Sequence, residues 1–310
     1  MSIAAPPPVR QPVHWLAATR PQFITITVVA VLVGLAASAH DGIAIDTLRL
    51  VLTLVGAIVV HAGANLVNDY HDRDGDARND ERLSPFTGGS RVIQQGLFSP
   101  RAAALYGYAL LALAAAIGAL LALTGRPALW TVGAAGLLLA VLYSAPPLRL
   151  SARGLGEFVI TGAWLLVVLG ADLVQRGSWS ITALAAGLPI GLLVAAILHV
   201  NEFPDRAADA ASGKQTIVVQ LGPRLAAWAY LALVLAAYLW LAFAAFADVL
   251  PRWTLIGWAA LPLSLFAAVH LIRHAGRAPT AVLMPAIKAT IAAAHLNGLL
   301  IAAALLFTAR

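Results

Sequence analysis

The sequence predicts an all-α membrane protein that crosses the bilayer nine times. Of its 310 residues, 61% are apolar and 11% are charged, whereas a soluble domain is about half apolar and about a quarter charged. The apolar residues fall in runs close to the roughly 20 residues that a helix needs to cross the hydrocarbon core. The chain has no cysteine, which excludes disulfides and thiol chemistry.

Nine apolar runs are long enough, or nearly so, to span a bilayer. They lie at about 22–40, 48–68, 102–124, 128–145, 156–174, 180–200, 225–247, 253–273 and 286–308. The fourth run is short and rich in glycine. The prolines near the start predict a disordered tail over residues 1–12, which leaves residues 13–310 as a single transmembrane domain.

The basic residues predict the orientation of these runs. With a cytoplasmic N-terminus, 15 of the 20 Lys and Arg residues fall in loops on the cytoplasmic side and five on the other side. Such a bias marks the cytoplasmic loops of membrane proteins, so we expect the N-terminus inside and the C-terminus outside. The net charge of +6 is then explained by these loops, and no nucleic-acid partner is expected.

Two acidic stretches share one pattern. Asn68-Asp69-x-x-Asp72-x-x-x-Asp76 follows the second run, and Asn201-Glu202-x-x-Asp205-x-x-x-Asp209 follows the sixth, 133 residues later. Nine of the 14 acidic residues lie in or beside these two stretches. On a helix each stretch falls within an arc of about 100°, with Asp74 well off that arc. Each acidic face therefore begins where a membrane helix ends, on the cytoplasmic side.

The repeated face predicts a site for a magnesium–diphosphate. Crowded carboxylates repel one another unless a cation lies between them. Mg²⁺ prefers hard oxygen ligands and takes one or two carboxylates together with substrate phosphates. A pair of solvated acidic helix ends is the structural alternative, and the repetition in an acid-poor chain argues against it.

The loops after the acidic stretches carry groups that suit an anion. Gly88-Gly89 allows a close approach of backbone N–H groups, and Arg91 follows it. Lys214 lies in the loop after the second stretch, where its compact positive charge could bind a phosphate. The alternative for the glycine pair is a plain turn, and the alternative for Lys214 is an interfacial lysine. His61 and His199 lie within the apolar runs. They lack the spacing of a zinc site, so we expect each imidazole to form a hydrogen bond with a neighbouring helix.

Together these segments resemble the UbiA superfamily of intramembrane prenyltransferases. The resemblance covers the chain from about Trp15 and rests on the paired acidic motifs. Further segments are similar to the menaquinone-pathway branch, whose members prenylate 1,4-dihydroxy-2-naphthoate. They are Pro85-Phe-x-Gly-Gly-Ser-Arg, Tyr143-Ser-x-Pro-Pro-Leu, Gly154-Leu-Gly-Glu and Gly213-Lys-x-Thr. The resemblance implies a helical bundle in a bacterial-type inner membrane, with a central cavity that opens near the cytoplasmic face.

The resemblance also implies roles for individual residues. Mg²⁺ would be held by Asp72, Asp76, Asp205 and Asp209 and would bridge the diphosphate of a polyprenyl donor. Asp72, Asp205 and Lys214 are the expected catalytic residues. Binding of the diphosphate would fall to Asn68, Arg78, Arg91, Arg153, Asn201 and Lys214. A small aromatic acceptor would lie near Arg20, Tyr70, Tyr143 and Arg149, and the donor chain would enter sideways from membrane lipid.

Two kinds of alternative stay open. An enzyme of the same fold could prenylate 4-hydroxybenzoate, homogentisate or heme instead. A cation-coupled transporter could use the acids as its relay, but transporter sites lie near the membrane midplane and often in inverted repeats. Here both stretches lie at one membrane edge and run in the same direction, which favours the enzyme. The acceptor, the prenyl length and the oligomeric state are not encoded in these patterns.

Overall fold

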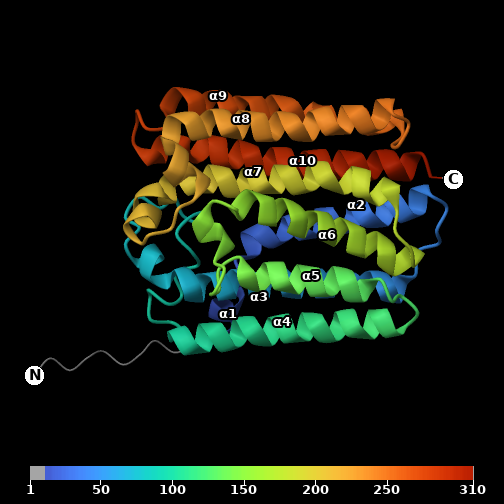
Figure 1. Ribbon diagram of the computed structural model, residues 1–310, viewed down its shortest axis with the longest axis horizontal. Coiled ribbons are helices and arrows are strands. Elements are labelled where there is room, and N and C mark those ends of the chain that lie inside the picture. Colours follow the sequence, from blue (N-terminus) through green and yellow to red (C-terminus); the bar gives the residue numbers. More distant parts are fainter. Residues whose placement is uncertain (1–10, 310) are drawn as a thin grey trace, which may run out of the picture.

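The computed structural model describes residues 11–309, and this part of the chain contains helices and no strand. The helices run side by side along the long axis of the molecule (Figure 1). They are α1 (Pro12–Ala18), α2 (Pro21–His40), α3 (Thr47–Ala77), α4 (Pro100–Leu123), α5 (Leu129–Leu142), η1 (Leu150–Arg153), α6 (Gly156–Arg176), α7 (Ile181–Ala211), α8 (Ile217–Phe246), η2 (Arg252–Ala260), α9 (Leu261–His274), η3 (Thr280–Leu283) and α10 (Met284–Phe307). The expected N-terminal tail lies outside the described residues, except for its last two positions, and α1 begins at Pro12.

The all-α membrane fold expected from the sequence is confirmed. Within residues 11–309, eight stretches of helix are long and apolar enough to cross a membrane. They correspond to all the expected runs but the fourth. At the place of the fourth run lies α5, an apolar helix of only 14 residues.

Capping side chains set several helix starts. The side chains of Asp46 and Ser180 accept hydrogen bonds from the backbone N–H groups of Arg49 and Ala183, at the N-termini of α3 and α7. Thr216 caps α8 in the same way, which satisfies one of the unpaired N–H groups at a helix start. As a result α8 begins well before the apolar run expected at 225–247, and the chain kinks at Gly222 before that run is reached.

Helices α3 and α7 are longer than a membrane crossing requires. Each has 31 residues, or about 46 Å at 1.5 Å per residue, against about 30 Å for the hydrocarbon core. Their last turns, which carry the two acidic stretches, extend past the apolar part. Both helices end at the left of Figure 1, and α10 ends at the opposite side.

The core packs closely on one side of the bundle. A large buried cluster joins α2, α6, α7, α8 and α10, and small residues let the backbones approach, as is usual between membrane helices. A Cβ atom added at Gly34 would overlap the carbonyl oxygen of Val168, and one added at Gly191 would meet that of Thr161. A cavity lies between this core and helices α4 and α5.

Candidate active site

The structure brings the two acidic stretches together at the mouth of one cavity. The cavity has a volume of about 600 Å³ and lies between α2, α3, α4, α5, α6 and α7. Its lining includes Asn68, Asp72, Asp76, Asn201, Asp205, Asp209 and Lys214. The two helical faces expected from the sequence thus meet across the end of the bundle.

Lys214 connects the two stretches. Its Nζ lies 2.9 Å from Asp72 Oδ2 and 3.5 Å from Asp209 Oδ1. The chain turns toward the cavity because Gly213 adopts a left-handed conformation just after α7 ends, which is a common way to terminate a helix. Burial acts to lower the pKa of Lys214, but the charges of Asp72 and Asp209 outweigh burial and hold that pKa well above its usual value. The side chain is therefore a fixed positive charge between carboxylates.

The loop between α3 and α4 folds over the acids. Asn79 Nδ2 and the Gly88 backbone N–H donate to Asp205 at 2.5 and 3.3 Å. Both Gly88 and Gly89 have φ of +72°, a conformation that side chains disfavour. A Cβ atom at Gly89 would also overlap the carboxylate of Asp76. The glycine pair is thus required for the close approach of this loop to the site.

A partly buried ion pair between Arg20 and Asp69 holds the same loop in place. Asp69 is 3% exposed, forms an ion pair with Arg20 and accepts hydrogen bonds from the backbone and hydroxyl of Ser90. Arg20 also donates to Asn68 Oδ1 at 3.2 Å and lines the cavity. Sequence reasoning assigned no separate role to Asp69. Its position next to Asn68 was the available signal, but its partners are 21 and 49 residues away.

Several expected site residues lie outside the cavity. Arg78 and Arg153 donate to the backbone oxygens of Ala211 and Pro147. Arg91 donates to the carbonyl oxygen of Asp76 at the end of α3, and Tyr70 faces the guanidinium of Arg73 at 5.0 Å. Arg149 lines a second, smaller pocket that shares Asp72, Asp76, Asp209 and Lys214 with the main cavity. Of the four expected acceptor residues, Arg20 and Tyr143 line the main cavity.

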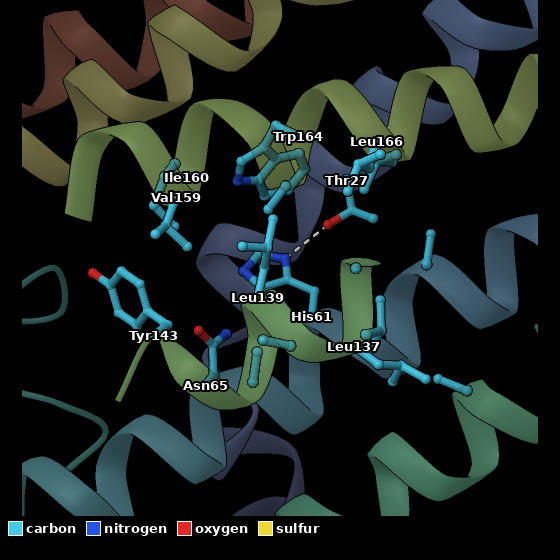
Figure 2. Close-up of a pocket in the computed structure, with 18 of the residues that line it drawn as sticks. Thr27, His61, Asn65, Leu137, Leu139, Tyr143, Val159, Ile160, Trp164 and Leu166 are labelled. Carbon is cyan, nitrogen blue, oxygen red and sulfur yellow. Dashed lines mark hydrogen bonds between the residues drawn. The ribbon is translucent and has the colours of Figure 1, made fainter. Parts of the chain in front are cut away.

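Below the acids the cavity is mostly apolar, with a few polar groups. Figure 2 shows His61, Asn65, Tyr143 and Trp164 around its central part. His61 shares a hydrogen bond of 2.7 Å with Thr27 of α2, as expected for a histidine satisfied by a neighbouring helix, and it meets Trp164 edge-on at 5.2 Å. His61 and Asn65 extend the polar face of α3 below Asn68, because they lie at helical spacing on the same side.

The oxygen set at the cavity mouth fits a hard cation. Asp72, Asp76, Asp205 and Asp209 are among the five carboxylates that line the cavity, and Mg²⁺ favours such ligands. In addition, Asp209 Oδ2 and Asn201 Oδ1 are buried without a hydrogen-bond partner among the described residues. Buried polar atoms are normally paired, so these oxygens are available to a cation or to a donor on a ligand.

Comparison with known proteins identifies the family. The UbiA prenyltransferase family matches residues 27–307. The chain belongs to this family. It is 30% identical over 276 residues to a 2-carboxy-1,4-naphthoquinone phytyltransferase of Synechocystis sp., covering 85% of this chain and 82% of the relative. It is also 30% identical over 260 residues to a 1,4-dihydroxy-2-naphthoate octaprenyltransferase of Mycobacterium tuberculosis, covering 82% and 85%.

Solved structures agree on the fold of this UbiA family member. A UbiA homolog from Archaeoglobus fulgidus bound to DMAPP and Mg²⁺ superposes with a TM-score of 0.66 at 21% identity, over 93% of this chain and 98% of that one. At that identity the likeness shows the fold alone. Family and apolar helices together make the protein an integral membrane prenyltransferase.

Proposed function

We propose that the protein transfers a polyprenyl group from a prenyl diphosphate to a dihydroxynaphthoate-type acceptor in a magnesium-dependent reaction. The observation that carries this proposal is Lys214, held between Asp72 and Asp209 at the mouth of an apolar cavity. A partly buried positive charge among carboxylates suits a diphosphate with its cation, and the apolar space below suits an isoprenoid chain. A prenyl diphosphate has a charged diphosphate and an apolar chain, and the cavity offers a charged end and an apolar part to match them.

The four aspartates Asp72, Asp76, Asp205 and Asp209 would hold the Mg²⁺. When bound, the metal supplies positive charge that stabilises the departing diphosphate. The unpaired oxygens of Asp209 and Asn201 support this assignment, as does the naming of Mg²⁺ in the structure of the homolog.

The chain's own residues bind and orient the donor. Lys214 would neutralise the diphosphate as the bond to the allylic carbon breaks. Asn68 is held by hydrogen bonds of 2.9 Å to both Asp72 and Ser144, so its amide is preorganised beside the ligand. The apolar walls would exclude water, which would otherwise capture the allylic cation. Trp164 and Tyr143 line the cavity and would border that cation.

The acceptor assignment rests on the relatives and on charge. Both relatives described above carry naphthoate or naphthoquinone names. Two of the four expected acceptor residues are basic, Arg20 and Arg149, and of these Arg20 lines the main cavity. Arg20 would therefore face the acceptor carboxylate. Tyr143 would border the ring. A 4-hydroxybenzoate, homogentisate or heme acceptor would leave the donor site unchanged.

The proposal includes the orientation in the membrane. With 15 of the 20 basic residues on the side of the acidic stretches, the site would face the cytoplasm of a bacterial-type inner membrane. A reporter fused into the loop at residues 78–99 should therefore score as cytoplasmic. An external score would refute this orientation.

The experiment that tests the function uses purified protein in lipid vesicles. We expect Mg²⁺-dependent conversion of dihydroxynaphthoate and a polyprenyl diphosphate to a prenylated, decarboxylated quinol, with no ion gradient applied. Homogentisate, 4-hydroxybenzoate and heme serve as competing acceptors. Faster turnover of any of these would reassign the acceptor, and the absence of diphosphate release with every acceptor would refute the donor chemistry.

A further inference from the structure

A buried group of three titratable side chains lies beside the cavity and has no part in the donor chemistry described above. It consists of Glu157 on α6 with His199 and Glu202 on α7, and none of the three is more than 6% exposed. One oxygen or nitrogen from each lies within 4.8 Å of the other two. Glutamate is rarely buried in this way unless it is paired. We call these residues the Glu–His–Glu cluster.

Hydrogen bonds show where the protons of this cluster lie. His199 Nε2 is 2.9 Å from the carbonyl oxygen of Ala226, which only accepts, so Nε2 carries a hydrogen. His199 Nδ1 is 2.6 Å from Glu157 Oε1, and two such atoms at that distance share one proton. Glu157 and His199 therefore form a fixed pair in which the imidazole cannot turn.

Glu202 is the member of the cluster that faces the cavity. It belongs to the cavity lining, next to Asn201, whereas Glu157 and His199 do not. Within residues 11–309, the hydrogen-bond contact of its Oε2 is a long one of 3.5 Å with the backbone N–H of Val218, and Glu157 Oε2 behind it has no hydrogen-bond partner. Two carboxylates this close and buried favour binding of an additional proton. Glu202 can thus take a proton from the cavity.

Other charges also act on Glu202. Asp209 lies on the same helix, Lys214 in the loop that follows, and Tyr143 at the end of α5. Lys214 is bound to Asp72 and Asp209, so it is not free to accept a proton. The Glu202 carboxylate therefore lines the cavity, with the Glu157 carboxylate and the His199 imidazole behind it.

We propose that Glu202 is the catalytic base that removes the hydroxyl proton of the aromatic acceptor, and that Glu157 and His199 position it. In this step the acceptor O–H bond breaks and its electron pair moves into the ring. A ring carbon forms the bond to the allylic carbon of the donor, whose bond to the diphosphate oxygen breaks. The proton passes to Glu202. This inference rests on the proposed function, because a hydroxyarene must be the acceptor.

The test replaces Glu202 with its uncharged isostere. In Glu202→Gln, kcat should fall by about 100-fold or more, the usual contribution of a general base, with KM for the donor and the Mg²⁺ requirement little changed. The decrease of kcat at low pH should disappear in the variant. Glu81→Gln is the matched control, since Glu81 is exposed on the loop after α3, and it should behave as wild type.

A second readout separates a base from a structural residue. A fluorinated hydroxyarene, already ionised at the assay pH, needs no base, so the ratio of wild-type to Glu202→Gln rates should shrink with this acceptor. Glu157→Gln can still donate a hydrogen bond to His199 but shares no proton, so it should move the low-pH decrease and lower kcat less than Glu202→Gln does. Retained Mg²⁺-dependent binding of a non-reactive prenyl diphosphate shows that each variant is folded.

The outcomes separate this inference from the function on which it rests. Wild-type kcat in Glu202→Gln across the pH range would overturn the inference and leave the prenyl transfer intact. Loss of donor binding in both Glu202→Gln and Glu157→Gln would also overturn it, by making the cluster a structural element. A tightly held metal in purified wild-type protein that is absent from His199→Gln would make the cluster a metal site instead. Failure of wild type to prenylate any hydroxyarene would overturn both proposals.

Discussion

At the scale of single residues, the position of a carboxylate on its helix decides its role. Asp72 and Asp74 are two residues apart on α3, yet the Asp72 side chain is 10% exposed and bound to Lys214, whereas that of Asp74 is 77% exposed. Asp74 has only a distant ion pair with Arg73 at 3.7 Å. Neighbouring acids of the same type thus differ in environment because the helix turns by about 100° per residue.

This difference gives a first prediction. Asp72→Ala should lower kcat/KM by about 100- to 1,000-fold, the usual loss when one preorganised electrostatic group is removed. Asp74→Ala should stay close to wild type, because an exposed pair contributes little. Diphosphate release from a labelled donor in vesicles measures both. Equal sensitivity of the two positions would contradict the assignment of the acidic face to the site.

The glycine pair gives a second prediction with a built-in control. Gly89 and Gly96 lie in the same loop and have φ of +72° and +69°, but an added Cβ would meet the Asp76 carboxylate at Gly89 and nothing within 4 Å at Gly96. Alanine at either position costs about 1–2 kcal/mol for the left-handed backbone. We expect only Gly89→Ala to raise the Mg²⁺ concentration needed for half-maximal activity. Parallel Mg²⁺ titrations measure this, and equal shifts would show that backbone conformation alone is responsible.

At the scale of elements, α5 lines the deep part of the cavity with residues that leave space. Gly133 and Gly136 belong to the cavity lining, and an added Cβ at either would meet no atom within 4 Å. Seen along α5, Gly136 lies two turns, or about 10 Å, from Tyr143 near the acids. A prenyl chain that enters from the site would run along this face of the helix.

A third prediction follows for the length of the donor. Gly136→Leu should retain turnover of geranyl diphosphate and lower that of longer prenyl diphosphates, because the added side chain fills the far part of the cavity. Leu138→Phe adds bulk on a side chain that is 58% exposed and should leave the length preference unchanged. Product analysis by mass spectrometry with a mixture of donors measures both. An unchanged length distribution in Gly136→Leu would place the chain elsewhere.

The elements also show which features the sequence could predict. Apolar runs predicted the membrane helices because about 20 apolar residues have few alternatives to a span, and the period of 3.6 placed Asp72, Asp76, Asp205 and Asp209 on common faces. The turn after Tyr143 was not predictable in the same way. Arg149 and Gly154 adopt left-handed conformations, Arg149 lines the second pocket, and Arg153 donates to the backbone oxygen of Pro147. Pairings such as Glu157 with His199, 42 residues apart, depend on how α6 packs on α7.

At the scale of the whole molecule, the two ends of the bundle differ in how their carboxylates are paired. At the end away from the site, Asp172 is 1% exposed and is bound by Ser38 at 2.7 Å and by Arg176 at 2.8 Å. Arg176 also pairs with Asp41 at 2.7 Å, so this network joins α2 to α6. At the site end, carboxylates are crowded, and Asp209 Oδ2 is buried without a hydrogen-bond partner within residues 11–309.

This contrast gives the last prediction. Asp172→Ala should lower the free energy of unfolding by about 3 kcal/mol, because it leaves Arg176 without its buried partner, while the activity of the folded fraction is kept.

Asp209→Asn should have the opposite effects. It relieves the repulsion between the crowded carboxylates and raises Tm without Mg²⁺, yet it lowers activity. Mg²⁺ with a prenyl diphosphate analogue should then raise Tm more in wild type than in Asp209→Asn, because only a ligand that binds the folded state stabilises it. Thermal unfolding in detergent, with and without Mg²⁺ and the analogue, compares the three proteins. A lower Tm for Asp209→Asn in the absence of Mg²⁺ would show that Lys214 already compensates the crowded carboxylates.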